Sequence, residues 1–292
     1  MEDSLFAPGH RACAGCGMPT AIKLVLDAAG PNTIVASPTG CLEVTSTPFP
    51  ESSWRVPWIH SLFENAAAVA SGVEVALKRF KRTDTNVLVI GGDGSTFDIG
   101  FGAISGMFDR GHRITYVCYD NEAYMNTGVQ RSASTPFCAK TTTTPTGKMS
   151  LGNPRPKKDM AAIAVAHGVP YVATASIAYP VDLRRKVKMS LSADGPAYIQ
   201  VNAPCITGWS FGEGDAIEQS RLAVETCLLP LIEYVDGVLV GVKKVRRKRP
   251  VEDYLKTQGR YKHLFKAEGG AEVLAKIQAI ADANAAKFGL LD

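Results

Sequence analysis

The feature that most constrains the fold of this chain is a recurring pattern of short apolar runs, rich in β-branched residues, with helical stretches between them. Such alternation is typical of βαβ units, whose crossover helices place consecutive strands parallel in one sheet. Each run is short and apolar enough to be buried on both faces of such a sheet. The pattern predicts an α/β fold with strands at Thr33–Ser37, Asn86–Ile90, Ile114–Tyr119, Tyr171–Ala175 and Ala197–Val201.

The segments between these strands show the periodicity of amphipathic helices. The first of them opens with Pro19, which is tolerated in the first turn of a helix. We expect the sheet to be mostly parallel, with helices on both of its faces. The helices are predicted at Pro19–Ala29, Glu64–Phe80, Ile99–Asp109, Asp159–His167, Val181–Ala193 and Gln219–Tyr234.

The sequence changes character after Asp236, where basic and polar residues become dense up to Glu268. It ends in an Ala-rich helix predicted at Ala271–Phe288. The apolar stripe of that helix consists of Val273, Ile277 and Ile280. We therefore divide the chain into one domain at residues 1–235 and a C-terminal extension at 236–292, which we expect to pack on partner subunits.

Charge and hydropathy exclude several classes of protein. The 32 Lys and Arg residues exceed the 28 Asp and Glu residues by four. This excess is too small to give the strongly positive electrostatic potential of a typical nucleic-acid-binding domain. No apolar run approaches the roughly 20 residues of a membrane helix, and the N-terminus lacks a signal-peptide pattern. We expect a cytoplasmic protein without a membrane or nucleic-acid partner.

The chain has seven cysteines, an odd number, which favours metal or redox use over a disulfide scaffold.

A glycine-rich turn, Gly92-Asp93-Gly94, directly follows the predicted strand Asn86–Ile90 and precedes a helix. Glycines let a diphosphate approach the backbone closely, and a helix N-terminus offers free N–H groups and positive potential. Asp93 would hold a divalent cation at this turn. The alternative interpretation of Gly-Asp-Gly is a tight turn without a ligand.

Asn121 favours the metal interpretation of that turn. It follows the next predicted strand, and residues 95–120 place 26 residues between Gly94 and Asn121. One carboxylate and one amide oxygen on neighbouring strand ends suit a Mg²⁺ ion shared with a diphosphate. The spacing therefore predicts a magnesium and diphosphate site.

Four cysteines form a second candidate site. Cys13 and Cys16 form a Cys-x-x-Cys pair, which places two thiolates on one turn, and Cys41 and Cys205 each follow a predicted strand. Ligands bind at the carboxyl edge of open α/β sheets, so we expect Cys41 and Cys205 to lie there with Asp93 and Asn121. A zinc ribbon would usually have a second Cys-x-x-Cys nearby. The scattered thiolates therefore favour a [4Fe–4S] cluster over zinc.

Both candidate sites resemble those of one enzyme family. The spacing from Gly-Asp-Gly to Asn is similar to the thiamine-diphosphate signature, and residues 93–100 and 119–130 resemble segments of the 2-oxoacid:ferredoxin oxidoreductases. The segments around Cys13, Cys41 and Cys205 look like the proximal-cluster ligands of the same family. The resemblance covers about residues 8–265 and is greatest to the β subunits of its pyruvate enzymes.

The resemblance implies the following site residues. Mg²⁺ would bind Asp93, Asn121 and the main-chain carbonyl of Ala123. Thiamine diphosphate would lie against Gly40, Cys41, Phe63, Gly92, Asp93, Gly94, Ser95, Asn121 and Asn126. A [4Fe–4S] cluster would be held by Cys13, Cys16, Cys41 and Cys205. No catalytic residue is assigned to this chain, because the activating glutamate of the family belongs to the partner that binds the aminopyrimidine.

The resemblance also implies a reaction and partners. The reaction is reversible oxidative decarboxylation of pyruvate to acetyl-CoA and CO₂, with coenzyme A as acyl acceptor and electrons passing through a [4Fe–4S] cluster to ferredoxin. The partners are the aminopyrimidine-side and ferredoxin-like subunits of one complex. Oxalate and branched-chain 2-oxoacids stay open as substrates. A non-catalytic iron–sulfur or zinc electron-transfer subunit, which would retain metal but no thiamine diphosphate, is the alternative from another class.

Three further features have competing interpretations. His60 is either an acid or base or a hydrogen-bonded structural residue, and we favour the latter. The loop at Thr141–Thr144 is a candidate lid. The basic run Lys243–Arg249 is either a solvated face or a surface that docks a neighbouring subunit or an acidic ferredoxin.

Overall fold

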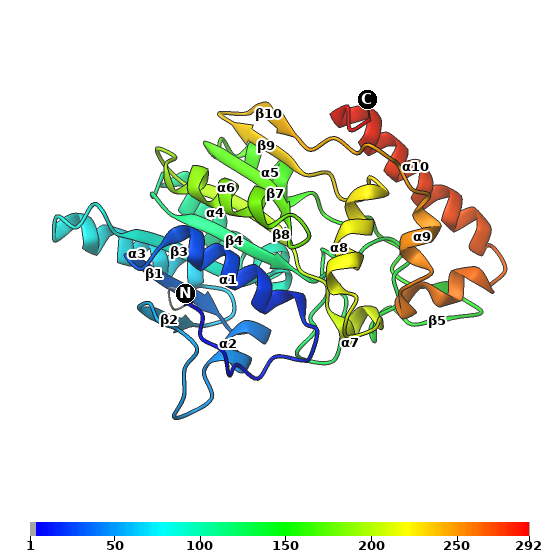
Figure 1. The fold of residues 1–292 in the computed structure, drawn as a ribbon, viewed down its shortest axis with the longest axis horizontal. Coiled ribbons are helices and arrows are strands. Elements are labelled where there is room, and N and C mark those ends of the chain that lie inside the picture. The colour runs from blue at the N-terminus through cyan, green and yellow to red at the C-terminus, as the bar shows by residue number, and fades with distance from the viewer. Residues whose placement is uncertain (1–3, 292) are drawn as a thin grey trace.

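One eight-stranded sheet organises the computed structural model, which describes residues 4–291 (Figure 1). The strand order is β10-β9-β7-β8-β4-β3-β1-β2. The six strands from β7 to β2 are parallel, whereas β9 runs antiparallel to both of its neighbours, β7 and β10. Their bounds are β1 Thr33–Pro38, β2 Trp58–Ser61, β3 Asn86–Gly92, β4 Thr115–Asp120, β7 Tyr171–Ser176, β8 Ala197–Asn202, β9 Ile232–Val235 and β10 Val238–Val242. All five predicted strands are confirmed, and the mostly parallel α/β class with them.

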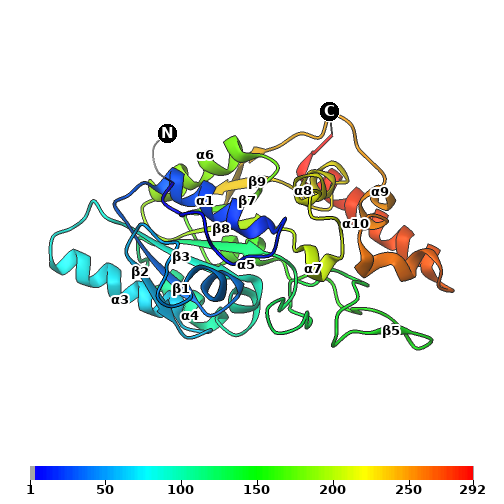
Figure 2. The ribbon, with the colours of Figure 1, turned by 60° about the horizontal axis from the view of Figure 1, so that its bottom comes forward.

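The helices form a layer on each face of the sheet. Helices α1 and α6 share one apolar cluster with the sheet, while α3, α4 and α5 share a second cluster on its opposite face (Figure 2). The helix bounds are α1 Gly17–Ala29, α2 Cys41–Ser46, α3 Ala66–Arg79, α4 Phe101–Asp109, α5 Met160–Ala166, α6 Pro180–Leu191, α7 Ile206–Trp209, α8 Ala216–Glu225, α9 Val251–Leu255 and α10 Gly270–Phe288. Shorter elements are the π-helical turn η1 Gly94–Asp98, the 3₁₀ helix η2 Gly259–Phe265, and the hairpin strands β5 Thr146–Gly147 and β6 Ser150–Leu151.

Both faces of the central strands are buried, as their apolar sequences predict. Every residue of β4, β7 and β8 is buried. Successive side chains of β4 enter opposite layers, since Val117 packs with α1 and α6 whereas Tyr116 and Cys118 pack with α3, α4 and α5. The sheet is therefore held from both sides by separate apolar cores.

The predicted helix at Gln219–Tyr234 is wrong in its second half. Helix α8 ends at Glu225, and strand β9 begins at Ile232. Between them the chain forms a turn, with Cys227 in the left-handed region at φ 62°. Pro230, which has no backbone N–H and disfavours a helix interior, then precedes the strand.

The C-terminal part forms a third apolar cluster beside the sheet, with α8, α9 and α10 grouped together (Figure 1). Strand β10 pairs with β9, so the boundary placed at 235/236 falls in the turn of a hairpin. In α10, Val273 and Ile277 are buried as predicted, but Ile280 is 42% exposed and Ala281 takes the buried position.

Among residues 4–291, no helix combines the length and apolar character needed to cross a membrane.

Candidate functional site

The carboxyl ends of β1, β3 and β4 border one cavity of about 130 Å³. Its lining consists of Thr39, Gly40, Cys41, Phe63, Gly92, Asp93, Gly94, Tyr119, Asn121, Ala123, Tyr124, Met125, Asn126 and Thr127. The cavity brings together nearly every residue assigned to the cofactor from the sequence. Ser95 lies behind this lining, where it is 2% exposed and its hydroxyl donates to the Gly92 carbonyl at 2.9 Å.

Three potential metal ligands converge at the cavity wall. One terminal atom of the Asn121 amide lies 2.9 Å from the Ala123 carbonyl oxygen and 3.0 Å from Asp93 Oδ1. With the amide nitrogen in that place, it donates to both oxygens; with the amide oxygen there, three oxygens adjoin without a hydrogen bond, an arrangement that a cation would stabilise. Ligands at 2.0–2.1 Å in an octahedral Mg²⁺ site are separated by about 2.9 Å along each edge. The donor set therefore matches a small divalent cation in both chemistry and spacing.

The surroundings of Asp93 also suit a cation. Its side chain is 1% exposed and accepts a hydrogen bond from the Ser132 hydroxyl. Burial, and then the nearby Asp120 carboxylate, raise the pKa of Asp93 well above its ordinary value. A buried carboxylate is costly when ionised, and a bound cation offsets that cost.

Close packing at the cavity excludes a side chain at Gly94 and leaves little room for one at Gly92 or Gly40. A Cβ on Gly94 would lie 2.4 Å from the Tyr124 ring, and a Cβ on Gly92 would lie 3.3 Å from Tyr119. Gly40 likewise faces the Tyr119 hydroxyl, which would be 3.1 Å from an added Cβ. These tyrosines shape the wall from the segment that also carries Asn121.

Sequence reasoning missed five lining residues. They are Thr39, Tyr119, Tyr124, Met125 and Thr127. Four of them lie between 119 and 127, inside the segment whose resemblance was noted, so their position in that segment was the available signal. The Tyr124 hydroxyl donates to Asp98 Oδ2 at 3.0 Å, and its ring meets Phe63 edge-on with centroids 5.8 Å apart.

The four candidate cluster ligands are all free thiols. Three of them, all except Cys13, lie at the N-terminus of a helix. Cys16 is the N-cap of α1, Cys41 is the first residue of α2, and Cys205 is the N-cap of α7. The Gly208 N–H points at Cys205 Sγ at 3.4 Å. Helix N-termini and N–H groups stabilise thiolates.

The cysteines also influence one another electrostatically. Burial, opposed in part by a backbone N–H and reinforced by Cys205 and Cys13, raises the pKa of Cys16 to about 11. Burial, with Cys205 and Cys16 next, raises the pKa of Cys41 to about 12. These mutual effects on the pKa values place Cys13, Cys16, Cys41 and Cys205 near one another. Within residues 4–291, no group of three or more His, Cys, Asp or Glu side chains is arranged so that it could hold one metal ion.

His60 lies at the rim of this region, as an exposed residue. Its Nε2 is 2.9 Å from the hydroxyl of Thr39, and its ring stacks on Trp58.

The loop Thr141–Thr144 is packed against the chain, because the Thr142 N–H donates to the Val129 carbonyl at 3.0 Å.

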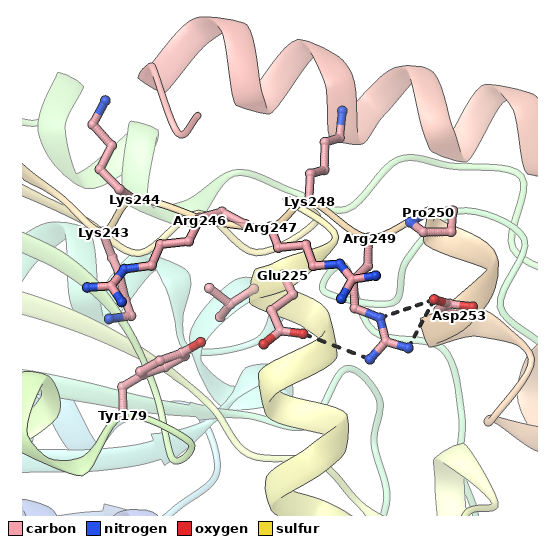
Figure 3. A pocket seen from close by; sticks show the side chains of 12 residues that line it. Tyr179, Glu225, Lys243, Lys244, Arg246, Arg247, Lys248, Arg249, Pro250 and Asp253 are labelled. Carbon is pink, nitrogen blue, oxygen red and sulfur yellow. Dashed lines mark hydrogen bonds and ion pairs between the residues drawn. The ribbon is translucent and has the colours of Figure 1, made fainter. Parts of the chain in front are cut away.

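The basic run Lys243–Arg249 lines a separate groove of about 700 Å³ (Figure 3). Arg249 pairs with Asp253 at 3.0 Å and lies 3.9 Å from Glu225, and the ammonium of Lys243 lies 4.3 Å from the centre of the Tyr179 ring. For Arg246 and Arg247, which are exposed, the described residues provide no ion pair. The groove therefore carries uncompensated positive charge.

Comparisons with known proteins agree with this geometry. Residues 38–201 match the family described as thiamine pyrophosphate enzyme, C-terminal TPP binding domain. The chain is 63% identical to the pyruvate synthase subunit PorB of Methanosarcina barkeri, covering 97% of this chain and 96% of that protein. It is 44% identical to the ketoisovalerate oxidoreductase subunit VorB of Pyrococcus abyssi, covering 94% and 90%.

A solved structure shares the fold. The 2-oxoglutarate:ferredoxin oxidoreductase from Magnetococcus marinus superposes with a TM-score of 0.56 at 23% identity, covering 76% of this chain and 84% of that one. The matched domain and the near-full-length relatives lead to one assignment. The chain belongs to the thiamine-diphosphate-binding β subunits of the 2-oxoacid:ferredoxin oxidoreductase family.

Proposed function

We propose that this chain is the β subunit of a pyruvate:ferredoxin oxidoreductase, which carries out reversible, coenzyme A-dependent oxidative decarboxylation of pyruvate. The observation that carries the proposal is the position of Cys41. This residue lines the cavity that holds the Mg²⁺ donor set, and it also belongs to the four cysteines proposed as cluster ligands. The residues that would hold the cofactor and those that would hold the cluster therefore meet at one wall of the cavity.

Each residue has a defined task in this proposal. Asp93, Asn121 and the Ala123 carbonyl hold Mg²⁺, and Gly92 lets the diphosphate approach the backbone. Phe63 and Asn126 border the cofactor. Bound thiamine diphosphate supplies the nucleophilic carbon for decarboxylation, and a [4Fe–4S] cluster held by the four cysteines accepts the electrons.

The activating glutamate is proposed to come from a partner subunit. Among the described residues that line the cavity, Asp93 is the sole carboxylate, and the metal would occupy it. An aminopyrimidine-side partner would complete the site, and ferredoxin-like subunits would pass electrons on to ferredoxin.

Pyruvate is proposed as the substrate because relatives named pyruvate synthase subunit PorB are 43–63% identical to this chain. A branched-chain 2-oxoacid is the second candidate, since the relative named ketoisovalerate oxidoreductase subunit VorB is 44% identical. Oxalate remains a third 2-oxoacid to be tested.

Two measurements on the purified complex test the proposal. Iron and sulfide analysis and low-temperature electron paramagnetic resonance of this subunit, separated from the complex and reduced, should show a [4Fe–4S] cluster, and the complex should contain bound thiamine diphosphate. Reduction of a viologen dye with coenzyme A should be fastest with pyruvate in a panel that includes 2-oxoisovalerate and oxalate. Stoichiometric zinc without iron would exclude the cluster, and metal without thiamine diphosphate would support a non-catalytic electron-transfer subunit.

A further inference from the structure

Glu122 has an unusual backbone conformation between two proposed metal ligands. Its φ is 70°, in the left-handed region that residues other than glycine seldom adopt. Asn121 precedes it and Ala123 follows it, so this conformation sets the directions of the Asn121 side chain and the Ala123 carbonyl. Such backbone strain persists only where surrounding contacts hold it.

Two cations hold the Glu122 side chain, which is 7% exposed as a residue. Lys157 Nζ lies 2.8 Å from Glu122 Oε1 and 2.6 Å from Asp120 Oδ2. Arg260 Nη2 lies 2.6 Å from Glu122 Oε2. Arg260 is itself 4% exposed and comes from η2 in the C-terminal extension, 138 residues further along the chain.

Arg260 also contacts the other side of the metal-binding segment through Trp209. Its guanidinium lies 3.9 Å from the centre of the Trp209 ring. The Trp209 indole N–H in turn donates to the Asn121 carbonyl at 2.8 Å. Trp209 belongs to α7, the helix that Cys205 caps. One guanidinium therefore fixes both the Glu122 carboxylate and, through the indole, the Asn121 backbone.

We infer that Arg260 is a positioning residue for the metal site: it holds Asn121-Glu122-Ala123 in the conformation that directs two ligands at Asp93. This inference rests on the proposed function and adds the C-terminal extension to the machinery of the site. Arg260 lies outside the cavity lining and acts through Glu122 and Trp209. Residues that orient metal ligands typically change metal affinity by about 10–100-fold when replaced.

The test uses Arg260→Gln in the full complex. Thiamine diphosphate is titrated at a series of Mg²⁺ concentrations, and Mn²⁺ is then substituted so that its electron paramagnetic resonance spectrum reports on the ligand arrangement. We expect the Mg²⁺ concentration for half-maximal cofactor binding to rise about 10–100-fold, with an altered Mn²⁺ spectrum and an unchanged cluster signal. Arg260→Lys keeps the charge but loses the planar stacking on Trp209, and should recover part of the affinity.

Arg185→Gln is the matched control. It breaks an ion pair between Arg185 and the buried Glu233 away from the cavity, so it should leave both the Mg²⁺ dependence and the Mn²⁺ spectrum as in the wild type. If Arg260→Gln also leaves the Mg²⁺ dependence and the Mn²⁺ spectrum as in the wild type, the inference is overturned. Should Arg260→Gln fail to fold, Glu122→Gln replaces it, and unchanged Mg²⁺ dependence in that variant overturns the inference equally. A wild-type complex that binds no thiamine diphosphate instead overturns the proposed function, and this inference with it.

Discussion

At the scale of single residues, the cavity depends on a few atoms from distant parts of the sequence. Asp93 Oδ1 and the Ala123 carbonyl lie within 3.0 Å of the same Asn121 amide atom. The sequence suggested Asp93 and Asn121 by their spacing, because strand ends in a parallel sheet meet at one edge. It could not show that Glu122 adopts φ 70°, because that conformation depends on Arg260, 138 residues away.

The first prediction concerns the metal ligands. Asp93→Ala should weaken thiamine diphosphate binding about 100-fold or more, because it removes a charged ligand, while Asn121→Ala should weaken it about tenfold. Calorimetric titration with Mg²⁺ present measures both. The cluster signal should persist in each variant, since neither substitution removes a thiolate. Normal cofactor binding in both variants would contradict the assignment of the Gly-Asp-Gly turn.

The second prediction concerns Gly94. Gly94→Ala places a methyl group 2.4 Å from the Tyr124 ring, so the ring must leave its position at the cavity wall. We expect a loss of about 1–3 kcal/mol in the free energy of unfolding, measured by denaturant titration, together with weaker cofactor binding. Gly102→Ala in α4 is the control, because an added Cβ there meets nothing within 4 Å. A Gly94→Ala variant as stable as that control would show that Tyr124 moves aside freely.

At the scale of elements, local sequence patterns predicted the strands that are buried on both faces and have continuous apolar sequences. The five central strands are short apolar runs, and the structure contains each of them. Strand β2 was missed because it is an edge strand of four residues with Ile59 and His60 exposed, so it lacks a continuous apolar run. The hairpin β9–β10 was missed for a different reason. Strand β9 has only four residues and was covered by the helix predicted at Gln219–Tyr234, so the apolar run Val238–Val242 was left without a strand to pair with.

The third prediction concerns the groove lined by Lys243–Arg249. Replacing Arg246 and Arg247 with glutamate should weaken assembly with a neighbouring subunit about tenfold and reduce the dependence of that assembly on salt. Reversal of Lys23 and Lys188, which are exposed on α1 and α6, changes the net charge equally and is the control. Analytical ultracentrifugation at several salt concentrations compares the two. Equal effects of both charge reversals would indicate that Lys243–Arg249 is a solvated face.

At the scale of the whole molecule, the fold explains why Cys41, Asp93, Asn121 and Cys205 could be assigned to one edge of the sheet from sequence alone. Parallel strands direct the segments that follow them to the same edge, so β1, β3, β4 and β8 deliver Cys41, Asp93, Asn121 and Cys205 there. The role of the C-terminal extension could not be found in this way. Its Arg260 reaches Glu122 only because α9, η2 and α10 pack in a third core beside the sheet.

The last prediction is that this chain alone is inactive. Among the described lining residues, the cavity offers Asp93 as its one carboxylate, so no second carboxylate there can activate the aminopyrimidine. Leu62, next to the cavity-lining Phe63, is 64% exposed and offers apolar surface for a partner to cover. Reconstituted with cluster, Mg²⁺ and thiamine diphosphate, the isolated chain should not reduce a viologen dye with pyruvate and coenzyme A. Addition of the aminopyrimidine-side subunit should restore turnover, whereas full turnover without it would show that this chain contains the whole active site.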